Sequence, residues 1–150
     1  MSALPGHLRL GAAAALLLLY GVHCARAHAD LALQPCDAAD PEQLWTLPAD
    51  TGVAGNFVHE STKKCLMPHG CNDDPETALV LDSCTPACLP QHKQAGTFIM
   101  QGHGRIVSQM KKQLVVHGGP PLALRTWMKA TTPAQQWLVG PAGKPPGGAG

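Results

Sequence analysis

Residues 31–47 read LALQPCDAADPEQLWTL, and residues 122–139 read LALRTWMKATTPAQQWLV. Both stretches start with an alternating Leu-Ala-Leu strand, pass through a turn-rich link and reach Gln-x-Trp near their ends. Residues 78–100 follow the same order, with ALVLDSCTPAC and then GTFIM, and have Phe98 in the place of the tryptophan. Three related segments in one short chain indicate an internal repeat of about 40 residues.

The two Gln-x-Trp tripeptides join Gln43 to Trp45 and Gln135 to Trp137. Side chains two residues apart on a strand point to the same face, so the amide and the indole enter the core together. There the indole fills volume and the amide satisfies buried backbone groups. These residues therefore predict a fold motif rather than a binding site.

The chain from Leu31 onward predicts an all-β domain. It keeps no helical period, and Gly or Pro interrupts it every several residues. A length of 150 residues excludes a large multidomain enzyme. Residues 140–150, GPAGKPPGGAG, lack the apolar bulk to pack and are expected to be a disordered tail. Strands are expected at residues 31–34, 43–47, 56–59, 64–67, 78–82, 97–101, 105–108, 113–117, 122–126 and 135–139.

Residues 1–29 have the pattern of a secretory signal peptide. A basic start precedes an apolar run over residues 10–22, and small residues follow with Ala-x-Ala spacing, so cleavage is expected after Ala27 or Ala29. The run of about 13 apolar residues falls short of the roughly 20 that span a bilayer, which favours a signal over a membrane anchor. We therefore expect a secreted chain without a membrane span, whose folded domain covers residues 30–139.

Charge is divided unevenly along the chain. All ten acidic residues lie within residues 30–82, whereas residues 83–150 hold seven of the eleven basic residues and no acid. The two halves should therefore attract each other. The basic half could instead present a cationic face to acidic glycans or to a partner protein, and nothing in the sequence indicates nucleic-acid binding. The basic residues considered for that face are Lys93, Arg105, Lys111, Lys112, Arg125 and Lys129.

The cysteine count predicts disulfides with one cysteine left over. Cys24 would leave with the signal peptide, and five cysteines would remain in an oxidising compartment. A zinc site formed by Cys65, His69, Cys71, Cys84 and Cys88 is the alternative. Its spacings do not match a Cys-x2-Cys knuckle, so we expect no metal. No nucleophile elbow, phosphate loop or metalloprotease helix is present, and we expect neither catalysis nor a cofactor.

These repeats resemble the ricin-type (ricin B-like) β-trefoil lectins. Four features carry the resemblance: the Gln-x-Trp repeat ends, the Cys65-Leu66 strand, the strand that leads to Cys84, and the Leu-x-Pro-Cys-Asp of residues 33–37. The resemblance covers residues 31–139. It implies a β-trefoil of three repeats that binds a carbohydrate or glycoprotein. It also implies a disulfide between Cys65 and Cys84, with Gln113 and Trp127 in the two cysteine places of the third repeat. A second disulfide between Cys71 and Cys88 is expected across the same hairpin.

The first repeat is short by this comparison. Trp45 follows the start of the expected mature chain at Asp30 so closely that the opening strands of the repeat are missing. Cys36 then lacks its partner and is expected to be unpaired or to form an intermolecular disulfide. An open barrel, a homodimer that covers the exposed strand edges, or a fragment of a longer protein would each account for the short repeat.

The resemblance further implies a sugar pocket made from an Asp after the Cys-Leu pair, an aromatic platform and an Asn before Gln-x-Trp. The corresponding residues here are Met67 and Val115 for the Asp, Gln34, Asp82 and Arg125 for the platform, and Glu42 and Ala134 for the Asn. No repeat keeps the full set, so the expected sugar site is degenerate. The polar residues expected to contribute to a surviving site are His69, Asn72, Asp73 and Asp74.

Two interpretations of these residues stay open. The four residues from His69 to Asp74 could simply form a solvated Asx turn. The whole domain could also be a structural or protein-interaction module that has lost sugar recognition.

Overall fold

The computed structural model describes residues 15–19, 23–27, 31–37, 39–48, 52–86, 88, 92, 94–102, 104–111, 114–118, 122–126 and 135–141. This part of the chain forms β-strands and two short 3-10 helices, η1 (Pro41–Gln43) and η2 (His69–Cys71). None of its helical segments has the length and apolar character needed to cross a bilayer. The predicted all-β class is confirmed.

The strands fall into three successive groups, which correspond to the three repeats. The first group is β1 (Ala15–Leu19), β2 (His23–Ala27), β3 (Leu31–Pro35) and β4 (Leu44–Thr46). The second is β5 (Ala54–Gly55), β6 (Val58–His59), β7 (Cys65–Pro68), β8 (Leu79–Asp82) and β9 (Phe98–Met100). The third is β10 (Ile106–Ser108), β11 (Leu114–His117), β12 (Ala123–Thr126) and β13 (Trp137–Pro141).

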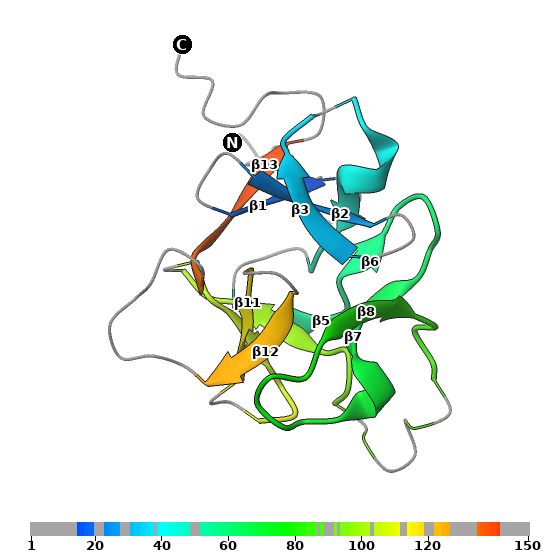
Figure 1. Cartoon of the computed structure of the whole chain (residues 1–150), viewed down its shortest axis with the longest axis vertical. Helices are drawn as coiled ribbons and strands as arrows, with labels where there is room; N and C mark the ends of the chain where they lie inside the picture. Colours follow the sequence, from blue (N-terminus) through cyan, green and yellow to red (C-terminus); the bar gives the residue numbers. More distant parts are fainter. Residues whose placement is uncertain are drawn as a thin grey trace, which may run out of the picture.

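Strand pairing joins neighbouring groups into a ring-like arrangement of two sheets, one of eight strands and one of five. The last strand of each of the first two repeats lies between the opening strands of its own and of the next repeat: β4 pairs with β1 and β6, and β9 pairs with β5 and β10. Strand β13 returns to β1, with a register that runs from Ala15↔Pro141 to Leu19↔Trp137. The hairpins β2–β3, β7–β8 and β11–β12 lie at three corners around this ring (Figure 1).

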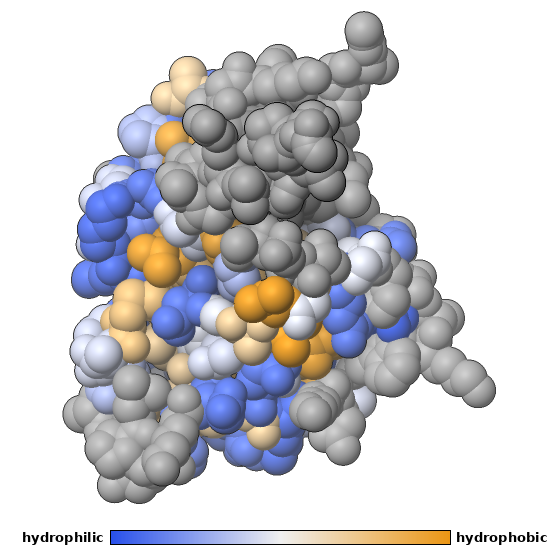
Figure 2. All heavy atoms as spheres, turned by 180° about the vertical axis from the view of Figure 1, so that it is seen from behind, coloured by the Kyte–Doolittle hydropathy of each residue, from blue (hydrophilic) through white to orange (hydrophobic). Residues whose placement is uncertain are grey.

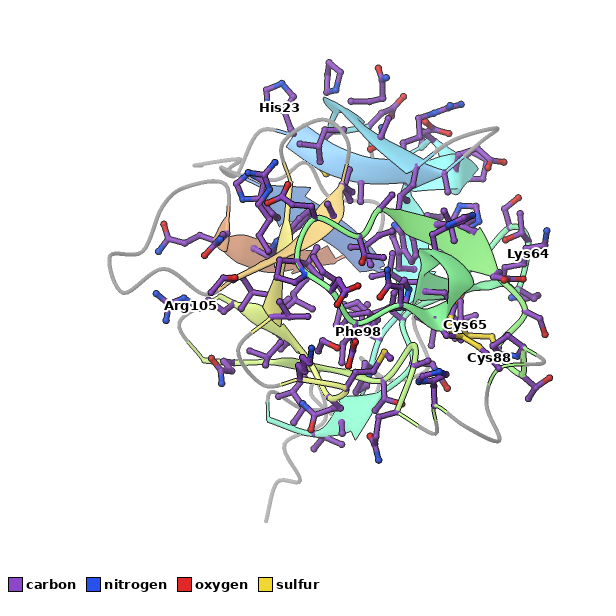
Figure 3. All side chains as sticks on the ribbon, turned by 60° about the horizontal axis from the view of Figure 1, so that its bottom comes forward. His23, Lys64, Cys65, Cys88, Phe98 and Arg105 are labelled. Atoms are coloured by element: carbon purple, nitrogen blue, oxygen red, sulfur yellow. A yellow bond between two sulfur atoms is a disulfide. The ribbon has the colours of Figure 1, made fainter. Side chains whose placement is uncertain are left out.

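The aromatic residues of the three repeat ends form the centre of the core, as predicted. Trp45, Phe98 and Trp137 are all buried. The Trp45 indole donates a hydrogen bond to the carbonyl of Ala25 at 3.1 Å, and the Trp137 indole donates the same bond to Val116 at 3.1 Å. Figure 3 shows Phe98 near the middle of the molecule. These matching indole bonds show that the first and third repeats are built alike.

The glutamines of Gln-x-Trp also act as predicted. Gln43 Nε2 donates to the carbonyl of Pro35 at 3.0 Å, and Gln135 Nε2 donates to the carbonyl of Thr126 at 3.4 Å. In both repeats the amide therefore ties the end of the third strand to the start of the fourth.

Residues 15–27 supply the strands that the sequence-based prediction of the first repeat lacked. Strand β1 pairs with β4 and β13, and β2 pairs with β3 over five positions. Ala25 and Ala27 are buried in the main core. The prediction that the opening strands are missing is therefore wrong. It followed from treating an apolar segment as a signal peptide, although a strand in the middle of a sheet has the same composition.

Cys36 is bonded to Cys24, which is fully buried. The prediction that Cys36 is unpaired or intermolecular is wrong, because it assumed that Cys24 is removed with the signal. A possible homodimer was one account of that thiol and of the edges left by missing strands; Cys24 and β1 fill those places, and the homodimer itself stays a prediction. Signal cleavage after Ala27 or Ala29 stays a prediction, and it would remove β1 and β2 from this fold.

The second repeat carries the two disulfides that were expected there. Cys65 is bonded to Cys84, and Cys71 to Cys88. Cys65 and Cys88 lie toward the edge of the molecule beside Lys64 (Figure 3). All ten predicted strands are present, and only β1, β2 and β5 were not predicted. The expected disordered tail is wrong for residues 140–141, which belong to β13, and its remainder lies outside the described residues.

Candidate functional site

The loop that was predicted to hold a sugar runs through η2 and brings His69, Asn72, Asp73 and Asp74 together. Asn72 Oδ1 accepts a hydrogen bond from the backbone N–H of Asp74 at 3.1 Å, which is the geometry of an Asx turn. Asp73 Oδ1 lies 3.5 Å from Lys111 Nζ. The side chains of Asn72 and Asp73 are therefore already engaged within the protein. The loop is a structured turn, which leaves few of its polar groups for a ligand.

Metal binding finds no support in the described part of the chain. The four cysteines of the zinc alternative are all in disulfides. No group of three or more His, Cys, Asp or Glu residues there is arranged to hold an ion.

Strand register identifies the equivalent positions of the three hairpins. Cys24 pairs with Gln34 in the first repeat, and Cys65 pairs with Asp82 in the second. In the third repeat Arg125 pairs with Val115. Val115 therefore stands in the place of the first cysteine of the other two repeats.

This register corrects the sequence alignment of the third repeat by two residues. The alignment put Gln113 in the cysteine place and Val115 in the Asp place, because Gln113-Leu114 looks like Cys65-Leu66. The pairing puts His117 in the Asp place. The Trp137 indole supports this assignment, since it bonds to Val116 as the Trp45 indole bonds to Ala25. Gln113 and Trp127 themselves lie outside the described residues.

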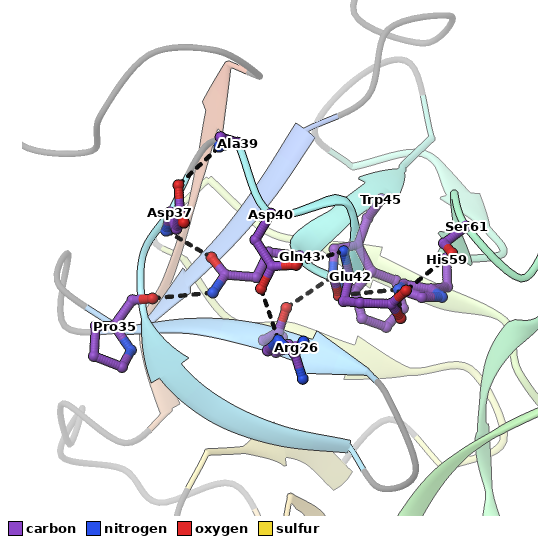
Figure 4. Close-up of polar contacts among 11 residues, drawn as sticks. Arg26, Pro35, Asp37, Ala39, Asp40, Glu42, Gln43, Trp45, His59 and Ser61 are labelled. Atoms are coloured by element: carbon purple, nitrogen blue, oxygen red, sulfur yellow. Dashed lines mark hydrogen bonds and ion pairs between the residues drawn. The ribbon is translucent and has the colours of Figure 1, made fainter.

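In the first repeat the Asp place is held by Arg26, which was not a candidate from sequence. Arg26 Nε donates to Asp40 Oδ2 at 2.7 Å (Figure 4). Asp40 also caps η1 by accepting from the Glu42 N–H at 3.0 Å. Arg26 therefore stabilises the turn before β4. The platform residue of the same repeat, Gln34, is exposed and has no aromatic ring.

Glu42, in the Asn place of the first repeat, is directed toward the second repeat. Its side chain accepts a hydrogen bond from Ser61 Oγ at 3.1 Å, and its backbone carbonyl lies 2.9 Å from His59 Nε2 (Figure 4). The corresponding Ala134 of the third repeat lies outside the described residues.

In the second repeat the Asp place is buried. Met67 packs with Cys65, Cys71 and Ala95 in a small core of its own. Gly96 holds the position that Gln43 and Gln135 hold in the other repeats, and a Cβ on it would collide with the end of the Met67 side chain. The thioether thus occupies the space left by the missing glutamine, so Met67 cannot meet a ligand at the surface.

The third repeat presents three polar side chains near one another, and only Arg125 among them was a candidate from sequence. Arg125 Nη2 lies 3.0 Å from Glu76 Oε2, and both side chains are well exposed. His117 is half-buried on the same hairpin. Burial and the charge of Arg125 lower the pKa of His117, and Glu76 opposes that shift. His117 was not a candidate from sequence, because no cysteine marks the strand register of this hairpin. Glu76, in a turn that precedes β8, was not a candidate either.

The expected attraction between the acidic and basic halves is visible at two contacts. Lys111 meets Asp73, and Arg125 meets Glu76, so the loop of residues 72–78 docks on the third repeat through both. Arg105 is buried, and is therefore no part of an open cationic face. Lys93, Lys112 and Lys129 lie outside the described residues.

Solved structures with the same architecture are β-trefoils. ThreeFoil, a designed 3-fold symmetric protein, matches with a TM-score of 0.66 at 10% identity, over 85% of this chain and 97% of that chain. The agglutinin from Abrus precatorius matches with 0.67 at 17% identity, over 85% of this chain and 46% of that chain. The C-half of the earthworm R-type lectin, solved in complex with GalNAc, matches with 0.57 at 10% identity, over 86% and 98%.

No protein-family model matches the chain, and no curated protein sequence does. At these low identities the structural likeness establishes the fold, and the fold is the β-trefoil that the sequence resemblance predicted.

Proposed function

We propose that this chain is a carbohydrate-binding, lectin-like module of the ricin-type group. The proposal is supported by the trefoil fold that the chain shares with the Abrus agglutinin and with the earthworm R-type lectin solved with GalNAc. Gln-x-Trp anchors hold the hairpins of the first and third repeats against the core, and the family resemblance puts a sugar at such hairpins. Because one fold can host many functions, the hairpin residues must decide what is bound.

Those residues support a degenerate site. The platform places hold Gln34, Asp82 and Arg125, none of which offers an aromatic ring for stacking on a sugar. Binding to a single neutral sugar should therefore be weak. The loop from His69 to Asp74 remains part of the proposal as a secondary contact, through the exposed His69 and Asp74.

We infer binding rather than catalysis because Asp37, Asp40 and Glu42 are hydrogen-bonded within the protein. A glycosidase needs two carboxyl groups facing a substrate. Asp37 accepts a bond from the Ala39 N–H at 2.9 Å, Asp40 caps η1, and Glu42 bonds to Ser61 (Figure 4). These three carboxylates, which lie close together in the sequence, are thus all engaged within the protein.

The surface favours a glycan over a protein partner. Figure 2 shows hydrophobic residues (orange) on the described part of one face, with hydrophilic residues (blue) between them. Among the described residues Val53 is the one large hydrophobic residue that is exposed, at 47%. A protein-docking face would need a larger continuous apolar patch.

The proposed setting is extracellular. Three disulfides in a domain of this size are typical of proteins that fold in an oxidising compartment. N-terminal sequencing of the exported protein would test the secretion, and would show whether the chain is cleaved after Ala27 or Ala29, which would remove Cys24 and leave two of these disulfides.

A glycan array probed with the full chain tests the binding proposal. Binding that free sugar inhibits is the expected result. The matched control is Trp45→Ala, which removes the anchor of the first repeat and should abolish binding together with the fold. No binding by the folded chain to any glycan on the array would contradict the proposal and leave the interaction module.

A further inference from the structure

The outer face of the β11–β12 hairpin carries two nitrogen-rich side chains. Leu114 and Val116 point into the main core. Alternation along the strand then puts His117 on the opposite face. Arg125 shares that face, because it pairs directly with Val115. His117 and Arg125 are diagonal neighbours across the hairpin, which is within reach of long side chains.

Both side chains keep a buried nitrogen without a hydrogen-bond partner. The two atoms are His117 Nδ1 and Arg125 Nε. Leaving a buried polar atom unpaired is unfavourable, so such atoms are uncommon in folded proteins. Two of them on one hairpin face indicate polar capacity that the fold itself does not use.

Glu76 already shows what kind of group this face accepts. Its carboxylate lies 3.0 Å from Arg125 Nη2, although 64% of the Glu76 side chain and 42% of the Arg125 side chain are exposed. The backbone of Glu76 is held in place by its N–H, which donates to the carbonyl of Leu124 at 2.7 Å. An exposed ion pair of this kind contributes little to stability, so a competing anion can replace the Glu76 side chain.

The other two hairpins do not offer this chemistry. In the first, Arg26 is bonded to Asp40 at 2.7 Å within its own repeat, and its platform neighbour Gln34 is uncharged. In the second, Met67 is buried and the platform place holds an acid, Asp82. Among the described residues of the three hairpins, those of the third combine an exposed guanidinium that pairs outside its own repeat with a second nitrogen group beside it.

We propose that the β11–β12 face binds an acidic sugar, whose carboxylate or sulfate takes the place of the Glu76 carboxylate on Arg125. A guanidinium can hold such a group through two parallel hydrogen bonds, and the His117 ring lies where it can contact the rest of the sugar. This inference rests on the proposed function and names its substrate class and its site.

Binding of the full chain to three oligosaccharide probes tests the inference. Hyaluronan supplies carboxylates alone, heparin supplies sulfates as well, and lactose is neutral. We expect at least one acidic probe to bind more tightly than lactose, and the two acidic probes distinguish carboxylate from sulfate recognition. Arg125→Gln should weaken the acidic probe about tenfold or more, because it removes charge-assisted hydrogen bonds.

Glu76→Gln provides the sharpest comparison. It breaks the same ion pair as Arg125→Gln, so the two variants should lose similar stability. Their effects on affinity should nevertheless be opposite, since removal of the competing carboxylate should tighten the acidic probe about two- to fivefold. Arg125→Lys, which keeps the charge but loses the planar fork, should lie between Arg125→Gln and the unchanged protein.

Lys111→Gln is the matched control for charge. It removes one positive charge from the same repeat, where Lys111 meets Asp73. It should change the affinity for the acidic probe less than about twofold, since an exposed pair contributes little. Equal losses in Lys111→Gln and Arg125→Gln would mean a diffuse cationic surface and overturn the inference, as would weaker binding by Glu76→Gln.

The remaining outcomes separate this inference from the proposed function. Binding to lactose alone, unaffected by Arg125→Gln, would overturn the acidic-sugar site and leave the lectin proposal standing. No binding to these probes or to any glycan on the array would overturn both. Thermal unfolding of each variant shows whether it is folded, and Arg125→Lys replaces Arg125→Gln if the latter is not.

Discussion

Gly96 shows how a single residue separates the second repeat from the other two. It lies at φ +75, and a Cβ there would collide with Met67. Gly96→Ala should therefore lower the free energy of unfolding by about 1–3 kcal/mol, through backbone strain and overpacking together. Urea unfolding followed by tryptophan fluorescence measures the change.

Gly70→Ala is the control for backbone strain alone. Gly70 has a similar positive φ of +64, but nothing lies within 4 Å of the place that its Cβ would take. It should be destabilised less than Gly96→Ala. Equal losses in the two variants would show that Met67 moves aside freely and that the collision is unimportant.

His117 should make stability depend on pH. Its pKa is lowered in the folded protein by burial and by Arg125, against the opposing effect of Glu76. The unfolded chain therefore binds a proton more readily at this residue, and stability falls as the pH drops below the unfolded pKa of about 6.5. The loss stops once the pH is below the folded pKa.

Urea unfolding of the unchanged protein and of His117→Gln, at pH 8 and at pH 5, isolates this effect. The other histidines titrate in both proteins, so the difference between the two pH dependences belongs to His117. The unchanged protein should lose more stability on acidification than the variant. Parallel losses would show that His117 titrates alike in the folded and unfolded states.

At the scale of elements, the two Gln-x-Trp anchors should differ in strength. Gln43 makes two bonds, since its Oε1 accepts from the Asp37 N–H at 2.8 Å and its Nε2 donates to Pro35. Gln135 makes one bond, of 3.4 Å to Thr126, and its buried Oε1 has no partner. Gln43→Ala should therefore destabilise the protein about 1 kcal/mol more than Gln135→Ala.

Chemical unfolding of the two alanine variants side by side makes this comparison, because both remove the same side chain from equivalent buried positions. Equal effects, or a larger effect of Gln135→Ala, would contradict the ranking of the two anchors.

Most elements could be predicted because their signals are local. Alternation at Leu122 and Leu124, or glutamine two residues before tryptophan, is visible within a few residues. Strand β1 could not be predicted in this way, since ALLLL fits the core of a signal peptide as well as a strand paired on both edges. Pairing with β13, over 100 residues later in the chain, decides between them, and no local pattern contains it.

Residues of the candidate site could be predicted only in a repeat whose strand register is marked by cysteines. Cysteines mark it in the second repeat, and Cys65 and Cys84 were placed correctly from sequence. The third repeat has Val115 in the cysteine place, so the alignment slipped by two residues and His117 was missed. A slip of two keeps every side chain on its face, which is why hydrophobic pattern alone did not reveal the error.

At the scale of the whole molecule, closure of the barrel depends on residues 15–27. They provide the strand that joins β4 to β13, the buried Ala25 and Ala27, and one half of the Cys24–Cys36 disulfide. A chain that starts at Asp30 would leave β13 without its β1 partner and Cys36 with a free thiol. It should lose cooperative unfolding, and its Cys36 should react with a thiol reagent under native conditions.

The full chain with Cys24→Ser and Cys36→Ser separates the strands from the disulfide. That variant keeps β1 and β2 but loses a crosslink worth about 3 kcal/mol in the chain-entropy estimate, so it should unfold cooperatively at a lower midpoint. The shortened chain should be far less stable than this variant, because strand pairing and core burial are lost as well. If the shortened chain instead unfolds cooperatively, with a midpoint equal to that of the full chain, residues 15–27 do not stabilise the barrel and the predicted cleavage leaves the folded domain intact.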